Sequence, residues 1–240
     1  MRKNVIILTH GWTGSSVFTA LIARAGYWTG NSTFEKRDYD TYENSKLIEL
    51  NRKMLIDLGY TGDHEHEFDP KVVSDLALRA SDIDLSPYCE FIDSCNENQP
   101  WIWKDPRLTW TIRVWANLMQ LDNVAFVILT RDDEQAWISS NLRKHIQSQQ
   151  FTRRYNKGIT DSLKQFLVSR DQKFLEFEFE DLLIEPKMTI DKLNDFLDTS
   201  LLMDDLHAVC KQPLYRKSKG FSDKIKAAAI YFKNYSERYR

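Results

Sequence analysis

Short apolar segments alternate along this chain with longer segments of helical periodicity. The apolar run at residues 5–8 is mostly β-branched, which predicts a buried strand. Similar runs predict further strands at residues 101–104, 124–130 and 173–179. Apolar positions spaced three and four residues apart predict helices at residues 17–25, 44–58, 107–121, 133–145, 155–168 and 189–197.

This order of elements predicts an α/β fold with three layers. Strands separated by helical crossovers form a mainly parallel central sheet with helices on both faces. No linker, repeat or low-complexity tract divides residues 1–240, so a single domain is expected. Ligands of such sheets bind beyond the carboxyl ends of the strands, and polar residues follow three of the predicted strands directly.

Two long polar segments, residues 27–45 and 60–70, are expected to be loops that cover or build a site. The second contains His64-Glu65-His66-Glu67, which has the residue types of a metal site. We interpret that run as an exposed acidic loop and expect no metal. Apolar positions at helical spacing in residues 223–240 predict a terminal helix that packs on the body.

The first predicted strand leads into a glycine-bearing loop and then a helix. Its sequence is His10-Gly11-Trp12-Thr13-Gly14-Ser15-Ser16. Backbone amides and the helix dipole converge at such a helix N-terminus, so the loop is expected to bind a phosphate or a related oxyanion in a P-loop-like way. A nucleoside-triphosphate P-loop has a Lys before its Ser or Thr, whereas Ser15 follows Gly14 directly here, which disfavours a kinase or an ATPase.

The start of this loop, His10-Gly11-Trp12, also resembles the oxyanion loop of α/β-hydrolases. That class of enzyme needs a nucleophile elbow of the form Gly-x-Ser-x-Gly. The pentapeptide occurs nowhere in the chain, so the hydrolase hypothesis has no nucleophile.

A basic residue stands at the carboxyl end of each of two other predicted strands. Lys104 ends the second strand, where alternation places it with Ile102 on the face opposite the two Trp side chains. Arg131 follows the third strand, and Ser139 lies eight residues later on the next predicted helix. The pair can hold one phosphate from two sides, with a bidentate guanidinium and a hydroxyl. The alternative interpretation is an ion pair of Arg131 with Asp132 or Asp133.

Charge and cysteine content narrow the class of protein further. The chain has 33 Lys and Arg against 35 Asp and Glu, a net charge of −2, so general nucleic-acid binding is not expected. Its 3 cysteines are an odd number and sparse, which favours free thiols in a reducing compartment. The start is too short for a signal peptide and no apolar run reaches membrane-spanning length, so a cytoplasmic enzyme without membrane contact is expected.

Together these segments resemble the sulfotransferase family that uses 3′-phosphoadenosine 5′-phosphosulfate, in particular its bacterial-type and tyrosyl-protein branch. Lys104-Asp105-Pro106-Arg107 is similar to the family's motif after the second core strand. Residues 177–186 resemble its strand, "EDL" and proline segment, and residues 42–58 its aromatic-Glu segment and second helix. The resemblance covers residues 4 to about 200 in the same order.

The resemblance implies a role for each candidate residue. The 5′-phosphosulfate would lie on the first loop, held by Trp12, Thr13, Gly14, Ser15 and Ser16. Arg131 and Ser139 would hold the 3′-phosphate, and the basic segment at residues 216–220 would fold over it. Catalysis would use Lys104 on the bridging oxygen and Glu43 as general base, with Glu35 and His10 as alternatives for the base.

One departure from the family affects the loop. Trp12 stands where the family has Lys or Arg, so Lys104, or less readily His10, is expected to supply the positive charge there. The acceptor would be a small molecule or a glycan bearing a hydroxyl or amine, stacked on Tyr27, Trp28, Tyr39 or Tyr42. An α/β-hydrolase-like esterase and a catalytically silent nucleotide-binding module are the alternative functions, and the oligomeric state is left open.

Overall fold

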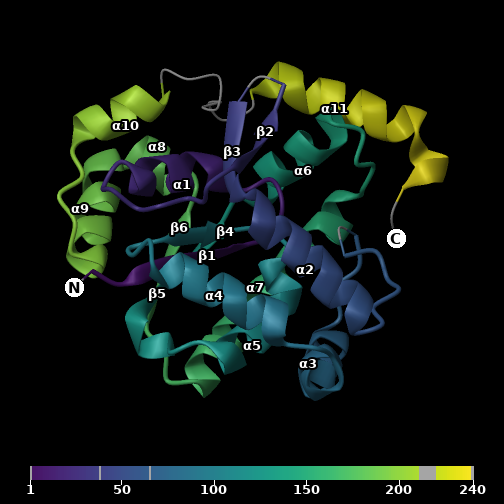
Figure 1. The fold of residues 1–240 in the computed structure, drawn as a ribbon. Helices are drawn as coiled ribbons and strands as arrows, with labels where there is room; N and C mark the ends of the chain where they lie inside the picture. The colour runs from purple at the N-terminus through teal and green to yellow at the C-terminus, as the bar shows by residue number, and fades with distance from the viewer. Residues whose placement is uncertain (1, 38, 65, 211–219, 239–240) are drawn as a thin grey trace.

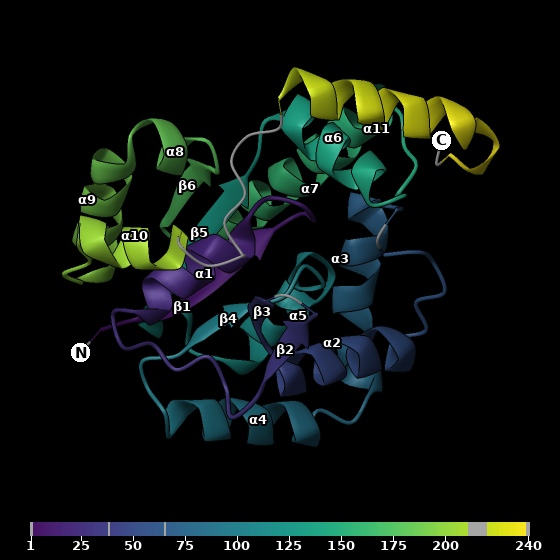
Figure 2. The ribbon, with the colours of Figure 1, turned by 90° about the horizontal axis from the view of Figure 1, so that it is seen from above.

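The computed structural model describes residues 2–37, 39–64, 66–210 and 220–238. At its centre is a parallel sheet in the order β4-β1-β5-β6. Its strands are β1 (Asn4–Thr9), β4 (Ile102–Lys104), β5 (Val124–Thr130) and β6 (Phe174–Glu178). The predicted α/β architecture with a parallel central sheet is therefore confirmed, and Figures 1 and 2 show helices on both of its faces.

The helices divide between the two faces of the sheet. One face is covered by α2 (Ser45–Asp57), α3 (Pro70–Leu78), α4 (Ser86–Asn96), α5 (Leu108–Leu118) and α7 (Gln149–Ser169). The other is covered by α1 (Ser15–Ala23), α8 (Asp181–Ile184), α9 (Pro186–Leu197) and α10 (Met203–Cys210). A third, smaller cluster joins α6 (Asp133–Leu142) to α11 (Phe221–Lys233), and the described chain has 3₁₀ turns at Arg79–Asp82, Leu121–Asn123 and Tyr235–Glu237.

Alternation along each strand produces these two cores. Ile6 packs into the core with α2 and α5, whereas Ile7 packs into the core with α1 and α9. In β4 the predicted alternation holds, because Trp101 and Trp103 stack with ring centroids 4.6 Å apart in the first core while Ile102 enters the second. The two inner strands, β1 and β5, are apolar over their central positions, as a buried parallel strand requires, whereas the edge strand β6 carries the exposed Glu176 and Glu178.

The segment at residues 27–45 differs from the prediction of a loop. It contains an antiparallel hairpin of β2 (Thr33–Lys36) and β3 (Tyr39–Asn44). The hairpin has a side-chain bond of its own, because the Thr33 hydroxyl donates to Asp40 Oδ2 at 2.7 Å. A polar strand of this kind has no apolar alternation to reveal it in the sequence.

Helix boundaries differ from the predictions by a few residues. The helix predicted at residues 133–145 ends at Leu142, and Lys144 has a φ of 64°, which no helix can continue. The helices α3, α4, α8 and α10 were not predicted. Within the described residues, no helix combines the length and apolarity needed to cross a bilayer. Cys89, Cys95 and Cys210 are free thiols.

Candidate functional site

The loops that follow β1, β4 and β5 meet at one end of the sheet, because β1 lies between the other two strands. A cavity of about 450 Å³ opens there. The residues assigned to donor binding line it together with Lys104 and Glu43, namely Trp12, Thr13, Gly14, Ser15, Ser16, Glu43, Lys104, Arg131 and Ser139. Segments far apart in the sequence thus form one site.

Gly14 shapes the side of this cavity that is formed by the loop after β1. Its φ is 72°, and a Cβ atom at this position would lie 2.4 Å from the Phe179 ring, so only glycine fits. Gly14 is also the N-cap of α1 and provides no side-chain acceptor. The first turn of α1 therefore presents its amides and the positive end of the helix dipole at the cavity, next to the Ser15 and Ser16 side chains.

Lys104, the last residue of β4, lines the same cavity. Its side chain is only 1% exposed, and Nζ donates to Glu43 Oε1 at 2.6 Å and to Ser16 Oγ at 3.2 Å. Glu43 belongs to β3, and the neighbouring Asn44 caps α2 with its side chain. The Glu43 carboxylate is thus directed at Lys104 rather than at the N-terminus of α2.

A buried network holds the segment after β4 in place. Asp105 is fully buried and accepts hydrogen bonds from Asn51 Nδ2 at 2.8 Å and from Arg107 Nη1 at 2.9 Å. Asn51 in turn accepts hydrogen bonds from Thr111 and Trp115 on α5. Since each member is bonded, the network fixes the backbone that carries Lys104.

Arg131 lies against the glycine loop. Nη1 donates to the Trp12 carbonyl oxygen at 3.0 Å, and the guanidinium lies over the Phe179 ring with 5.2 Å between Cζ and the ring centroid. Its carboxylate partner is Glu180, at 3.3 Å from Nε, rather than Asp132 or Asp133. Burial lowers the pKa of Arg131 and the charge of Glu180 opposes that shift. Ser139, on α6, lines the same cavity.

The two alternative bases are placed less favourably. Burial lowers the pKa of His10 to about 4, and its Nδ1 atom lies 2.9 Å from the Gly11 carbonyl oxygen. His10 is therefore neutral at neutral pH and a weak proton acceptor. Glu35 is exposed on β2 and is not among the residues that line the cavity.

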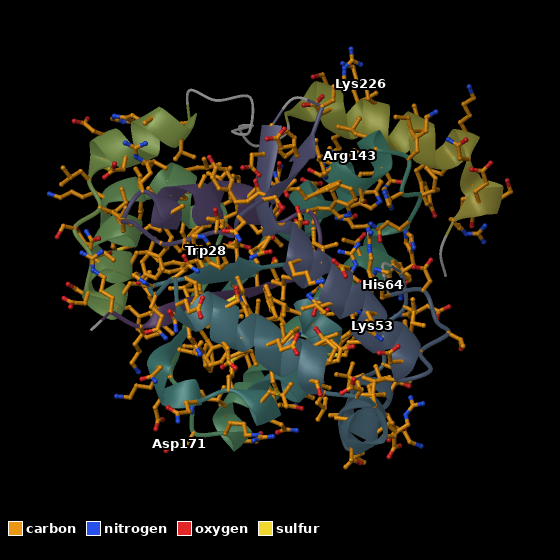
Figure 3. The ribbon with its side chains drawn as sticks, in the orientation of Figure 1. Trp28, Lys53, His64, Arg143, Asp171 and Lys226 are labelled. Carbon is orange, nitrogen blue, oxygen red and sulfur yellow. The ribbon has the colours of Figure 1, made fainter. Side chains whose placement is uncertain are left out.

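Two cavity residues that sequence reasoning missed follow α6. The Arg143 guanidinium lies over the Trp12 ring, 4.7 Å from its centroid, and His145 meets the same ring edge-on at 4.9 Å. Arg143 and His64, both labelled in Figure 3, lie on the side of the molecule toward which the strands run. No local signal marks these residues, because their partners are far away in the sequence.

The segment at residues 60–70 is largely a loop, as predicted, but its interpretation as exposed is wrong for one residue. His66 is 9% exposed, and its ring stacks on that of His145 with centroids 5.4 Å apart. Among the described residues, no group of three His, Cys, Asp or Glu side chains is arranged to hold a metal ion.

Most of the aromatic residues that were expected to stack on the acceptor do not line the cavity. Tyr27 is buried in the core beneath α1, and Tyr42 packs against the same core. Trp28 bridges to Trp101 at the amino end of β4, away from Lys104, and Figure 3 shows it on that side. Only Tyr39 of this group lines the cavity. The basic segment at residues 216–219 lies outside the described residues.

Fold and site together define an α/β protein with a glycine-bearing loop and a helix N-terminus at the carboxyl edge of a parallel sheet. No protein-family model and no curated protein matches the sequence. Among solved structures, the sulfotransferase domain from the curacin biosynthetic pathway is similar, with a TM-score of 0.55, 16% identity and coverage of 93% of this chain and 82% of that one.

Sulfotransferase STF9 from Mycobacterium avium is also similar, with a TM-score of 0.50, 14% identity and coverage of 98% of this chain and 76% of that one. At these identities the comparison establishes the fold. The chain has the sulfotransferase fold, as the resemblance in its sequence implied.

Proposed function

We propose that this protein is a sulfotransferase that moves a sulfuryl group from 3′-phosphoadenosine 5′-phosphosulfate to a hydroxyl or amine acceptor. One observation carries the proposal. A single cavity holds two buried cations, Lys104 and Arg131, which contact opposite parts of the same glycine loop through Ser16 and Trp12. A nucleotide with two separate anionic groups matches such a pair.

The residues of the cavity fit this donor. The uncapped N-terminus of α1 and the hydroxyls of Ser15 and Ser16 would hold the phosphosulfate. Arg131 and Ser139 would hold the 3′-phosphate, with Glu180 keeping the guanidinium in place. The positive charge that Trp12 does not supply would come from Lys104 and from Arg143, which lies over the Trp12 ring.

Lys104 would stabilise the negative charge that develops on the bridging oxygen as the bond to sulfur breaks. Its ammonium is fixed by Glu43 and Ser16, so little reorganisation is needed during the reaction. The contact with Lys104 supports a positioning role for Glu43. Assignment of Glu43 as the general base stays a prediction, as does the cytoplasmic location.

The acceptor would enter beside the β2–β3 hairpin. Phe34, Lys36 and Tyr39 from this hairpin line the cavity, and Glu43 of the same hairpin contacts Lys104. This surface combines aromatic, aliphatic and cationic groups, which suits a small-molecule or glycan acceptor.

Ligand binding tests the donor assignment. Adenosine 3′,5′-bisphosphate at 100 times its Kd should add about 2.7 kcal/mol of stability. For a chain of this length, that corresponds to a rise in Tm of about 5–11 °C. ATP at the same concentration should raise Tm much less, because it lacks the 3′-phosphate. Equal shifts with both nucleotides would contradict the assignment.

Transfer of labelled sulfate tests the reaction. The full chain is incubated with ³⁵S-labelled donor and a panel of alcohols, phenols, amines and sugars, and labelled product is separated from donor. Product formation that depends on Lys104 supports the proposal. Binding of adenosine 3′,5′-bisphosphate without any labelled product would instead favour a nucleotide-binding module, and labelling by a serine-directed fluorophosphonate would favour a hydrolase.

A further inference from the structure

A chain of three polar side chains leads from the surface into the cavity. Asp63 Oδ2 lies 2.8 Å from His66 Nδ1, and His66 Nε2 lies 3.2 Å from His145 Nδ1. His145 lines the cavity, whereas the ring of His66 is buried behind it. Both distances are within hydrogen-bonding range, so the three side chains are connected.

The order of donors and acceptors fixes the tautomers of the neutral rings. A carboxylate can only accept, so the proton of His66 lies on Nδ1, which faces Asp63. His66 Nε2 then carries the lone pair and accepts from Nδ1–H of His145. As a result, the lone pair of His145 lies on Nε2.

The position of His145 relates this chain to the reaction. Its ring contacts the Trp12 ring, and Trp12 belongs to the loop that would hold the donor. When His145 gains a proton, its positive charge is shared with His66 through their hydrogen bond. The negative charge of the Asp63 carboxylate stabilises it.

We propose that His145 accepts the proton of the acceptor hydroxyl, with His66 and Asp63 as positioning residues. The inference rests on the proposed sulfotransferase function. As the acceptor oxygen forms its bond to sulfur, the bond from sulfur to the phosphate oxygen breaks and its electron pair leaves with adenosine 3′,5′-bisphosphate. The hydroxyl proton passes to Nε2 of His145. Glu43 then remains the partner of Lys104.

Nitrogen NMR of the full chain tests the relay without any substrate. With ¹⁵N-labelled histidine, long-range ¹⁵N–¹H correlations report which ring nitrogen carries the proton, and the spectrum of His145→Gln identifies the signal. We expect the proton of neutral His145 on Nδ1, and loss of this preference in His66→Phe. The exposed His207 on α10 is the internal control. A proton on Nε2 of His145 in the unmodified protein would overturn the proposal.

The catalytic role is tested by measuring kcat for sulfuryl transfer from labelled donor, with either water or an accepted alcohol as the acceptor. His145→Gln should lower kcat by about 10²-fold or more while binding of adenosine 3′,5′-bisphosphate is unchanged. Asp63→Asn and His66→Phe should lower kcat by about 10-fold and leave the KM for the donor unchanged. Added imidazole should restore part of the activity of His145→Gly. His207→Gln is the matched control and should behave as the unmodified chain.

The outcomes separate this proposal from the proposed function. Unchanged kcat in His145→Gln, together with full loss in Glu43→Gln, would assign the base to Glu43 and overturn the role of His145 while leaving the sulfotransferase intact. A protein that transfers no sulfate at all would contradict the proposed function, and the catalytic role of His145 with it. The tautomer measurement would still establish whether the relay itself exists.

Discussion

The ammonium of Lys104 lies 2.6 Å from Glu43 Oε1, and this contact joins the end of β4, an edge strand of the central sheet, to the hairpin strand β3. Lys104 is almost fully buried and Glu43 is 14% exposed. Such a pair is held in one geometry, and removal of one partner leaves the other charge partly buried. The hairpin and the sheet are therefore coupled at the point where the reaction would occur.

Lys104→Ala should reduce kcat by about 10²–10³-fold, because it removes the donor to the bridging oxygen. Donor affinity should fall much less, since the N-terminus of α1 and Arg131 remain. Steady-state kinetics with labelled donor and calorimetric titration of adenosine 3′,5′-bisphosphate measure the two effects. Lys53→Ala, at an exposed position paired with Asp57, is the matched control. Full turnover in Lys104→Ala would exclude the role.

Gly14→Ala should destabilise the fold by about 1–3 kcal/mol and abolish donor binding. The added Cβ would meet Phe179 at 2.4 Å, and the positive φ of residue 14 strains any side chain. Urea denaturation measures the free energy of unfolding. Gly11→Ala, where a Cβ would meet nothing within 4 Å, should unfold like the unmodified chain. Equal stability of the two variants would show that the loop adapts.

Asn51→Ala should lower the free energy of unfolding by about 2–5 kcal/mol, because it leaves Asp105 Oδ2 and the indole N–H of Trp115, both buried, without their partner. The loss should also reduce kcat, since the network fixes the segment that carries Lys104. Asn98→Ala, at an exposed site, is the control. A loss in Asn51→Ala no larger than in the control would mean that water replaces the network.

Arg131→Ala should remove discrimination in favour of the 3′-phosphate. We expect the affinity for adenosine 3′,5′-bisphosphate to fall by about 10–100-fold and the affinity for adenosine 5′-phosphate to change little. Calorimetric titration with the two nucleotides gives the ratio. Arg153→Ala, on the exposed face of α7, should leave the ratio unchanged. An equal loss for both nucleotides would place Arg131 elsewhere on the donor.

Acid should destabilise the fold through His10. The pKa of buried His10 is lowered to about 4 from 6.5, so between these values the unfolded chain binds a proton that the folded chain does not. Stability should therefore fall as pH drops from 6.5 to 4, with a contribution of about 3 kcal/mol in all. Urea denaturation measures the free energy of unfolding across this pH range. The free energy should fall less steeply with decreasing pH in His10→Gln than in the unmodified chain, whereas His207→Gln should match the unmodified chain. If the free energies of unfolding of His10→Gln and the unmodified chain fell equally with pH, the lowered pKa of His10 would be contradicted.

The sequence determined the sheet and the parts of the site that are local. Residues 124–129 are all apolar, and only a strand covered on both faces buries such a run fully, so β5 was predicted with its correct limits at 124–130. Gly14 lies in the loop after β1, Lys104 ends β4 and Arg131 directly follows β5, and parallel strands bring their carboxyl ends to one edge. The candidate donor-binding residues could therefore be identified before any coordinates.

Tertiary structure alone decided which residues from distant segments complete the site. His145 and Arg143 reach the cavity because α6 ends at Leu142 and the chain turns back toward Trp12. Trp28, by contrast, pairs with Trp101 at the amino end of β4, which is the end away from the cavity. Periodicity reports burial along one segment, but contacts between segments depend on how the whole chain packs, and no local pattern contains that information.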